Sequence, residues 1–222
     1  MSKITGCRQS DCIIGGVSGI CGVLLLVTSF VINSGPPSGA NPADLASFAQ
    51  QNYARVLWGA WMQGVGPVLI VLFAFVLVHL AGASQQLAGW MTFFGATILM
   101  TVSLIEITFY IGALYRDPAI MPSVSLALIS AVQHLYFIVA APALFLPLGL
   151  LLVRCRILPR VFGYLALALA ATFAVLGVVF LLRLTLPDAV TAFAGVQAFW
   201  WLTAAIALIV RRRKISGIPE TL

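Results

Sequence analysis

The chain has 222 residues, of which 62% are hydrophobic and 8% are charged, and its formal net charge is +6. Soluble domains average about 25% charged residues, so this composition excludes an ordinary soluble domain. Six apolar stretches approach or exceed the length of about 20 residues that spans a hydrocarbon core as a helix. The composition therefore predicts an all-α polytopic membrane protein, with six transmembrane helices in one bundle and one domain over residues 1–222.

The positive charges gather in connections that lie on one side of such a bundle. They precede the first stretch, join the fourth to the fifth and follow the sixth, at Lys3, Arg8, Arg154, Arg156, Arg160, Arg211, Arg212, Arg213 and Lys214. Short loops rich in Lys and Arg remain in the cytoplasm. Both termini are therefore expected in the cytoplasm. This asymmetry is typical of a protein in a lipid bilayer and accounts for the positive net charge. No nucleic acid is therefore expected as a partner.

The expected elements are long helices with short connections. The six spans are predicted at about 13–33, 54–82, 87–114, 123–153, 161–183 and 190–210. Between the first two, Asn41-Pro42 is typical of a helix start, which predicts a short interfacial helix over about 42–53 on the outer side. In the first span, Gly15 and Gly19 form a small-xxx-small pair, which is typical of close packing within the chain or between copies in a homo-oligomer.

The third span contains Glu106, an acidic residue deep within an apolar stretch. A charged side chain at the bilayer centre costs at least about 2.5–3.5 kcal/mol, so Glu106 has to be neutralised, paired or hydrated. It belongs to a small and polar stripe at helical spacing, which is expected to face the bundle. The stripe consists of Thr92, Gly95, Leu99, Ser103, Glu106 and Tyr110. In the second span, Pro67 has no amide hydrogen to donate to the carbonyl of Gln63, four residues earlier. Gln63 therefore offers both a polar side chain and a free backbone acceptor.

Four helices are expected to place polar side chains at one depth, roughly 12–18 Å below the outer surface at about 1.5 Å per residue. We predict a polar pocket there that opens to the outer side, for small-molecule or proton-linked binding or transport. Its sharper form pairs Glu106 with His134, and Arg183 lies above, where it could reach Glu106. The candidate pocket residues are Glu106, His134, Gln63, Gln133, Gln197, Tyr110, Arg183, Trp58, Trp61 and Trp201.

Other interpretations of the same residues remain open. The polar groups could serve only as hydrogen bonds between helices, with the tryptophans in an aromatic belt. The chain could be a non-catalytic subunit or assembly partner of a membrane complex. It could also be a membrane enzyme that acts on a lipid headgroup, with Glu106 and His134 as acid and base. No HExxH, DDxxD-like or nucleophile-elbow motif supports an enzyme.

No cofactor or metal site is predicted. Ligation of haem by two histidines fits badly, because His79 is expected near the inner face and His134 nearer the middle of the membrane. The cysteines form no metal or redox motif, and free thiols are expected at Cys7, Cys12, Cys21 and Cys155.

Two short motifs suggest a relationship. The segment Gln133-His-Leu-Tyr136, followed by Ile157-Leu-Pro-Arg-Val-Phe-Gly163, resembles a group of bacterial six-span membrane proteins known only as a domain of unknown function. The resemblance covers roughly residues 87–183, and the Leu-Pro-Arg-x-x-Gly turn is its most specific part. The Pro- and Gly-rich first outer loop departs from that group. The resemblance implies a bacterial inner (cytoplasmic) membrane protein and transfers no activity.

Overall fold

The computed structural model describes residues 9–33, 42–112, 121–155, 157–181 and 187–212. All regular structure among these residues is helical, and six of the helices are long and apolar enough to cross a membrane. The chain is therefore a multi-pass membrane protein, as its composition predicts. In chain order the helices are α1 (Gln9–Ile32), α2 (Pro42–Gln51), α3 (Tyr53–Leu80), α4 (Leu87–Gly112), α5 (Met121–Leu135), η1 (Tyr136–Ala140), α6 (Ala141–Arg154), α7 (Arg160–Leu181) and α8 (Pro187–Val210).

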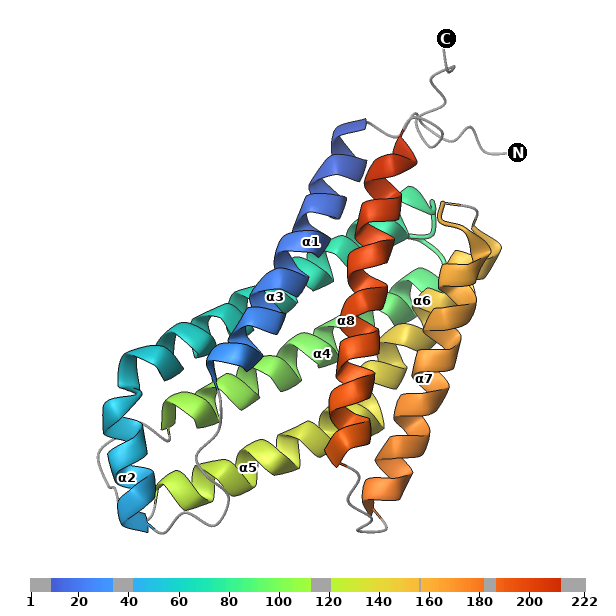
Figure 1. Cartoon of the computed structure of the whole chain (residues 1–222). Helices are drawn as coiled ribbons and strands as arrows, with labels where there is room; N and C mark the ends of the chain where they lie inside the picture. Colours follow the sequence, from blue (N-terminus) through green and yellow to red (C-terminus); the bar gives the residue numbers. More distant parts are fainter. Residues whose placement is uncertain (1–8, 34–41, 113–120, 156, 182–186, 213–222) are drawn as a thin grey trace.

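The start of α1 and the end of α8 lie at the same end of the bundle (Figure 1). This end, which we call the basic end, also carries the turn from α6 to α7 with Arg154 and Arg160. Arg211 ties the end of α8 to that turn, because its Nη1 donates a hydrogen bond of 3.2 Å to the carbonyl of Ile157. The sequence-based assignment of the basic end to the cytoplasm stays a prediction.

Glycines of α1 let this helix approach α3 and α8 closely. A Cβ on Gly22 would lie 2.8 Å from the carbonyl oxygen of Gly66 in α3, and a Cβ on Gly19 would lie 2.8 Å from the Cβ of Ala205 in α8. Real Cβ atoms do not approach other atoms so closely, so only glycine fits at these crossings. The small residues of the first span therefore pack within the chain.

The small and polar stripe of α4 faces the bundle, as predicted. Thr92, Gly95 and Leu99 are buried, and a Cβ on Gly95 would overlap the backbone of Ala143 in α6. Glu106 follows on the same side of α4, and it is half-buried. The close crossing of α4 and α6 thus determines the direction in which Glu106 points.

The stretch expected as one span over 123–153 is divided into three helical pieces. The five-residue π-helix η1 separates α5 from α6, and the amide of Ala141 bonds to the carbonyl of Tyr136, five residues earlier. Pro142 has no amide hydrogen for the carbonyl of Ile138, which breaks the normal α-helical ladder at this point. The segment long and apolar enough to cross the membrane is Ala131–Arg154, and the first part of α5 lies beside α2 (Figure 1).

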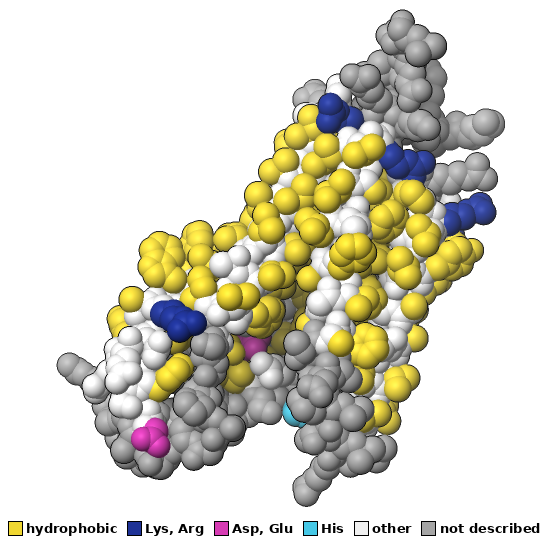
Figure 2. Space-filling model, in the orientation of Figure 1, with side chains coloured by type: hydrophobic (Ala, Val, Ile, Leu, Met, Phe, Trp, Pro, Cys, Tyr) yellow, Lys and Arg dark blue, Asp and Glu magenta, His cyan; other side chains and the backbone are white. Residues whose placement is uncertain are grey.

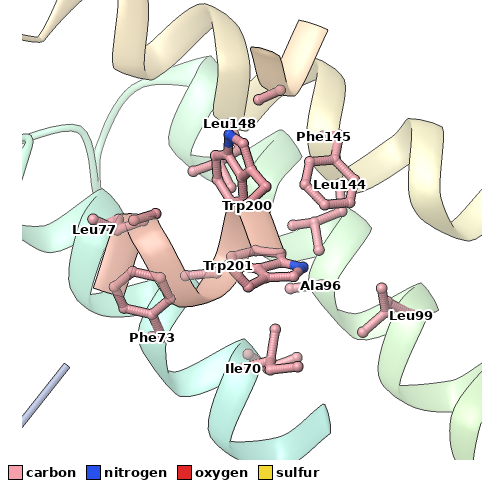
Figure 3. Close-up of a cluster of buried hydrophobic side chains, with 14 of the residues drawn as sticks. Ile70, Phe73, Leu77, Ala96, Leu99, Leu144, Phe145, Leu148, Trp200 and Trp201 are labelled. Atoms are coloured by element: carbon pink, nitrogen blue, oxygen red, sulfur yellow. The ribbon is translucent and has the colours of Figure 1, made fainter. Parts of the chain in front are cut away.

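An aromatic core fills the half of the bundle nearer the basic end. The indole of Trp201, on α8, lies among Phe73 of α3, Ala96 of α4 and Phe145 of α6 (Figure 3). Its ring centroid is 5.9 Å from that of Phe73 and 5.2 Å from that of Phe145. Trp200 packs against Trp201 with centroids 4.7 Å apart. These side chains are nearly inaccessible to solvent, so the bundle is closed at this level.

Candidate polar site around Glu106

The carboxyl group of Glu106 is held by two glutamine amides from two different helices. Nε2 of Gln63, on α3, donates a hydrogen bond of 2.8 Å to Oε2. Nε2 of Gln133, on α5, donates one of 3.1 Å to Oε1. Each carboxyl oxygen therefore has one neutral donor, and the residue joins three helices. The polar layer proposed from the sequence is realised at these three side chains.

The site lies farther from the basic end than the aromatic core does. Gln63 precedes Phe73 by ten residues on α3, and Glu106 follows Ala96 by ten residues on α4. At about 1.5 Å per residue, both intervals correspond to about 15 Å along the helix axis. The glutamate is thus stacked beyond the aromatic core, in the half of the bundle away from the basic end.

Gln63 is deeply buried because α3 crosses α1 and α4 at small residues. The side chain is 2% exposed, Gly66 contacts α1 at Gly22, and Gly64 faces Ile107 of α4. The helix continues through Pro67, which lies inside α3. The glycines at these crossings leave space for the side chain of Gln63, whose amide donates its hydrogen bond to Glu106 of α4.

The fourth helical stretch contributes Gln133 to Glu106, and the pairing of Glu106 with His134 stays a prediction. Within the part of the chain that the structure describes, the hydrogen bonds of Glu106 come from the two glutamines. His134 is half-buried and has contacts of its own. Neighbouring residues of a helix point about 100° apart, so only one of the two can face α4 directly.

A second polar pair lies one helical turn from Gln133. The hydroxyl of Tyr136, in η1, donates a hydrogen bond of 2.6 Å to Oε1 of Gln197 on α8, and Gln197 is buried. Tyr136 and Tyr110 are both near enough to Glu106 to interact with it electrostatically. Sequence reasoning did not include Tyr136 in the pocket, although its spacing of three residues from Gln133 places the two on one face.

The remaining predicted residues are distributed differently. Trp58 and Trp61 are 61% and 53% exposed and pack edge to face at 6.0 Å, on the surface of α3. They lie about 140° and about 160° around the helix from Gln63, so they face outward when Gln63 faces the bundle. Trp201 belongs to the aromatic core, and its indole nitrogen has no hydrogen-bond partner among the described residues. Arg183 lies outside the described residues.

The molecule is hollowed beside this site. Toward the end opposite the basic end, α3 and α4 run away from α8 (Figure 1), and acidic side-chain atoms are visible in a hollow there (Figure 2). Four of the five residues from 192 to 196 in α8 are exposed, and a Cβ added to Gly195 would meet nothing within 4 Å. This part of α8 is therefore largely uncovered by other described residues.

A shallow cleft of about 330 Å³ lies at the basic end, between α1 and α3. It is lined by Asp11, Ile14, Phe75, Val76 and His79. His79 thus lies in a different half of the bundle from His134, as the sequence predicts. Among the described residues, no three His, Cys, Asp or Glu side chains gather as they would to hold a metal ion.

No protein-family model, curated protein or solved structure matches this chain. Its function therefore has to be inferred from the geometry around Glu106.

Proposed function

We propose that this membrane protein binds a small ligand or a proton at Glu106, from the side of the bundle that lies away from its basic end. The observation that carries the proposal is a half-buried carboxyl group in a membrane span that accepts one hydrogen bond on each oxygen. An ionisable residue within a membrane span marks a functional site by default, because its insertion is costly.

The burial of the three side chains favours a binding site over a purely structural connection. Gln63 is buried, Glu106 is half-buried and Gln133 is exposed. Exposure therefore increases from Gln63 through Glu106 to Gln133. A group whose only role is to join helices gains most when it is sequestered, because hydrogen bonds are stronger where the local dielectric is low.

The aromatic core bears on the choice between binding and transport. Phe73, Phe145 and Trp201 close the bundle between Glu106 and the basic end. Binding at Glu106 needs no rearrangement of this core. Transport would require α8 to move relative to α3 and α6, as in the alternating-access motion of one helix bundle against another. Proton-linked binding is thus the activity that we assign first.

Dicyclohexylcarbodiimide provides the test. This apolar reagent partitions into bilayers and adds a protonated carboxylic acid across a C=N bond, and the product rearranges to a stable N-acylurea. We expect peptide mapping to find the label on Glu106 and to show less of it as the pH rises from about 5 to about 9, because the ionised carboxylate does not react.

The control is Glu106→Gln, which preserves the shape of the side chain and should lose the label while retaining its helical circular dichroism. Wild-type protein that is folded but unlabelled at Glu106 throughout this pH range would contradict the proposal. If Glu106→Gln fails to assemble in the membrane, the glutamate has a structural role.

A further inference from the structure

The hydrogen-bonding capacity of Glu106 is only partly used. An ionised carboxylate offers about four acceptor positions, and the two glutamine amides occupy one on each oxygen. Both of these donors are neutral, so neither brings a positive charge to the ionised form. The remaining acceptor positions suit a ligand that brings positive charge and N–H groups.

The described arginines lie at the ends of helices, away from this carboxyl group. Arg55 is in the first turn of α3, and the others are at the basic end, at Arg154, Arg160, Arg211 and Arg212. No Lys or Arg within the described part of the chain contacts Glu106. Charge complementarity therefore disfavours an anionic ligand. A hard metal ion such as Mg²⁺ or Ca²⁺ is disfavoured too, since it needs several oxygen ligands and the two glutamines present N–H groups here.

Two tyrosines lie within electrostatic range of the carboxyl group. Tyr110 and Tyr136 are both within electrostatic range of Glu106, and Tyr136 is itself buttressed by Phe137 and Phe173 at centroid distances of 5.4 and 6.0 Å. Aromatic faces attract organic ammonium groups through the ring quadrupole, and the attraction is stronger where water is excluded. A carboxylate with two tyrosines in its surroundings is thus suited to an ammonium headgroup.

The segment of α8 that precedes Gln197 is apolar and exposed. Residues 192–196 of α8 carry no charge, Val196 is 51% exposed, and hydrophobic side chains flank the hollow (Figure 2). An aliphatic tail could lie along this segment while its headgroup reaches Glu106. We propose, building on the binding function above, that the ligand is an amphipathic organic cation whose ammonium group binds Glu106 and whose apolar part lies against α8.

Protection from carbodiimide labelling tests this ligand class in the wild-type protein. Lipid nanodiscs that contain the protein are labelled in the presence of octylammonium, octanol or octyl sulfate, which share one tail and differ in headgroup charge. We expect octylammonium to slow the labelling of Glu106 by at least about tenfold relative to octanol, the discrimination that one charge-assisted hydrogen bond provides. Octyl sulfate should protect no better than octanol.

A matched pair of variants tests the aromatic contribution. Tyr110→Phe retains the ring and should retain the protection, whereas Tyr110→Leu removes the ring and should weaken protection by octylammonium alone. Equal protection by octylammonium and octanol would overturn the cation proposal but leave the labelled Glu106, and hence the binding function, intact. Absence of label without any amphiphile would instead contradict the binding function itself. If octylammonium protects only after Arg183→Gln, an internal arginine holds the cation position and the proposal fails.

Discussion

Glu106 shows how a bundle can shelter an acid inside an apolar span. Removing its solvation costs several kcal/mol in hydrocarbon, and hydrogen bonds to the ionised group recover part of this cost. The two donors differ in environment, because Gln63 is 2% exposed and Gln133 lies on the surface of the bundle. Their contributions to stability should therefore differ.

Gln63→Leu should destabilise the protein more than Gln133→Leu does. The first substitution leaves a buried carboxyl oxygen without its 2.8 Å donor, which costs about 1–3 kcal/mol. The second removes a longer hydrogen bond at an exposed position, where lipid headgroups or water can replace it. Thermal unfolding of the two variants in the same detergent measures the difference. Equal melting temperatures for both variants would contradict the proposed difference in burial.

Cys155 provides a test of local structure at the basic end. Burial raises the pKa of its thiol, and the nearby charge of Arg154 lowers it by a smaller amount; the Sγ atom faces the carbonyl of Ala81 at 3.8 Å. The thiolate is the form that reacts with N-ethylmaleimide. Where Cys155 is the only cysteine, its alkylation should be slower in the folded than in the denatured chain.

The pH dependence has a definite sign. Because the pKa of the Cys155 thiol is raised, the alkylation rate of the folded protein should keep rising above pH of about 8.5, the ordinary value for a thiol. Arg154→Gln removes the opposing charge and should slow the reaction further. An alkylation rate that levels off once the pH passes the ordinary thiol pKa would show that this turn is open to solvent. A rate that is unaffected by Arg154→Gln would show the same.

Individual residues also mark the limit of sequence reasoning. Glu106 and its two glutamine partners were predicted as one polar layer, because counting residues from the helix ends gives their depth. The choice between Gln133 and His134 depends on how α5 is rotated and tilted, and neighbouring residues on one helix have the same depth within about 1.5 Å. The same count gives the depth of Trp58 and Trp61 but not the direction in which their side chains point, and both face away from the bundle.

At the scale of helices, glycine contacts control how closely pairs of helices approach. Gly95 touches the backbone of Ala143, where α4 crosses α6, whereas Gly195 in α8 has open space around it. The two glycines form a matched pair, since both lie inside long helices and differ mainly in their surroundings.

Gly95→Ala should therefore destabilise the bundle, by about 1–3 kcal/mol as expected for overpacking. Gly195→Ala should be neutral or stabilising by up to about 1 kcal/mol, because alanine favours helix over glycine. Unfolding curves and carbodiimide labelling of both variants provide the measurement. Only Gly95→Ala should change the labelling of Glu106, since it displaces α4. Similar behaviour of the two variants would contradict the close crossing of α4 and α6.

The spans themselves were predictable and the π-helix was not. The expected span 87–114 agrees closely with α4 at Leu87–Gly112. The agreement is close because the length of the apolar stretch is enough to predict such a helix. The prolines of the fourth stretch predict a disturbance, but they do not specify a five-residue π-helix at Tyr136–Ala140. That outcome depends on close packing with α7, where a Cβ on Gly177 would lie 2.9 Å from the Cα of Ile138.

At the scale of the whole molecule, the two halves of the bundle differ in packing. Near the basic end, α3, α4, α6 and α8 converge on the aromatic core. At the other end, α8 is more exposed, with open space around Gly195, and Figure 2 shows a hollow in this half of the molecule. Composition predicts both a bundle and a polar centre, but not the close packing of α8 against α1 at Gly16 and Gly19, which no local pattern in α8 indicates.

The orientation of the bundle is a prediction at this scale. With the basic end in the cytoplasm, reporter fusions at residue 1 and at residue 222 should both give cytoplasmic signals. A fusion within 113–120, which joins α4 to α5, should give an external signal. Opposite signals at all three positions would invert the assignment and place the hollow on the cytoplasmic side.

The central claim is that α3 and α5 bring donors to the carboxyl group of Glu106. Infrared difference spectroscopy tests it most directly, with the Glu106 band assigned by subtraction of the Glu106→Gln spectrum and with Gln86→Leu, an exposed position at the basic end, as the control. We predict that Gln63→Leu and Gln133→Leu each shift this band, because each removes one hydrogen bond, and that Gln86→Leu leaves it unchanged. A band that stays in place in both glutamine variants would contradict the site.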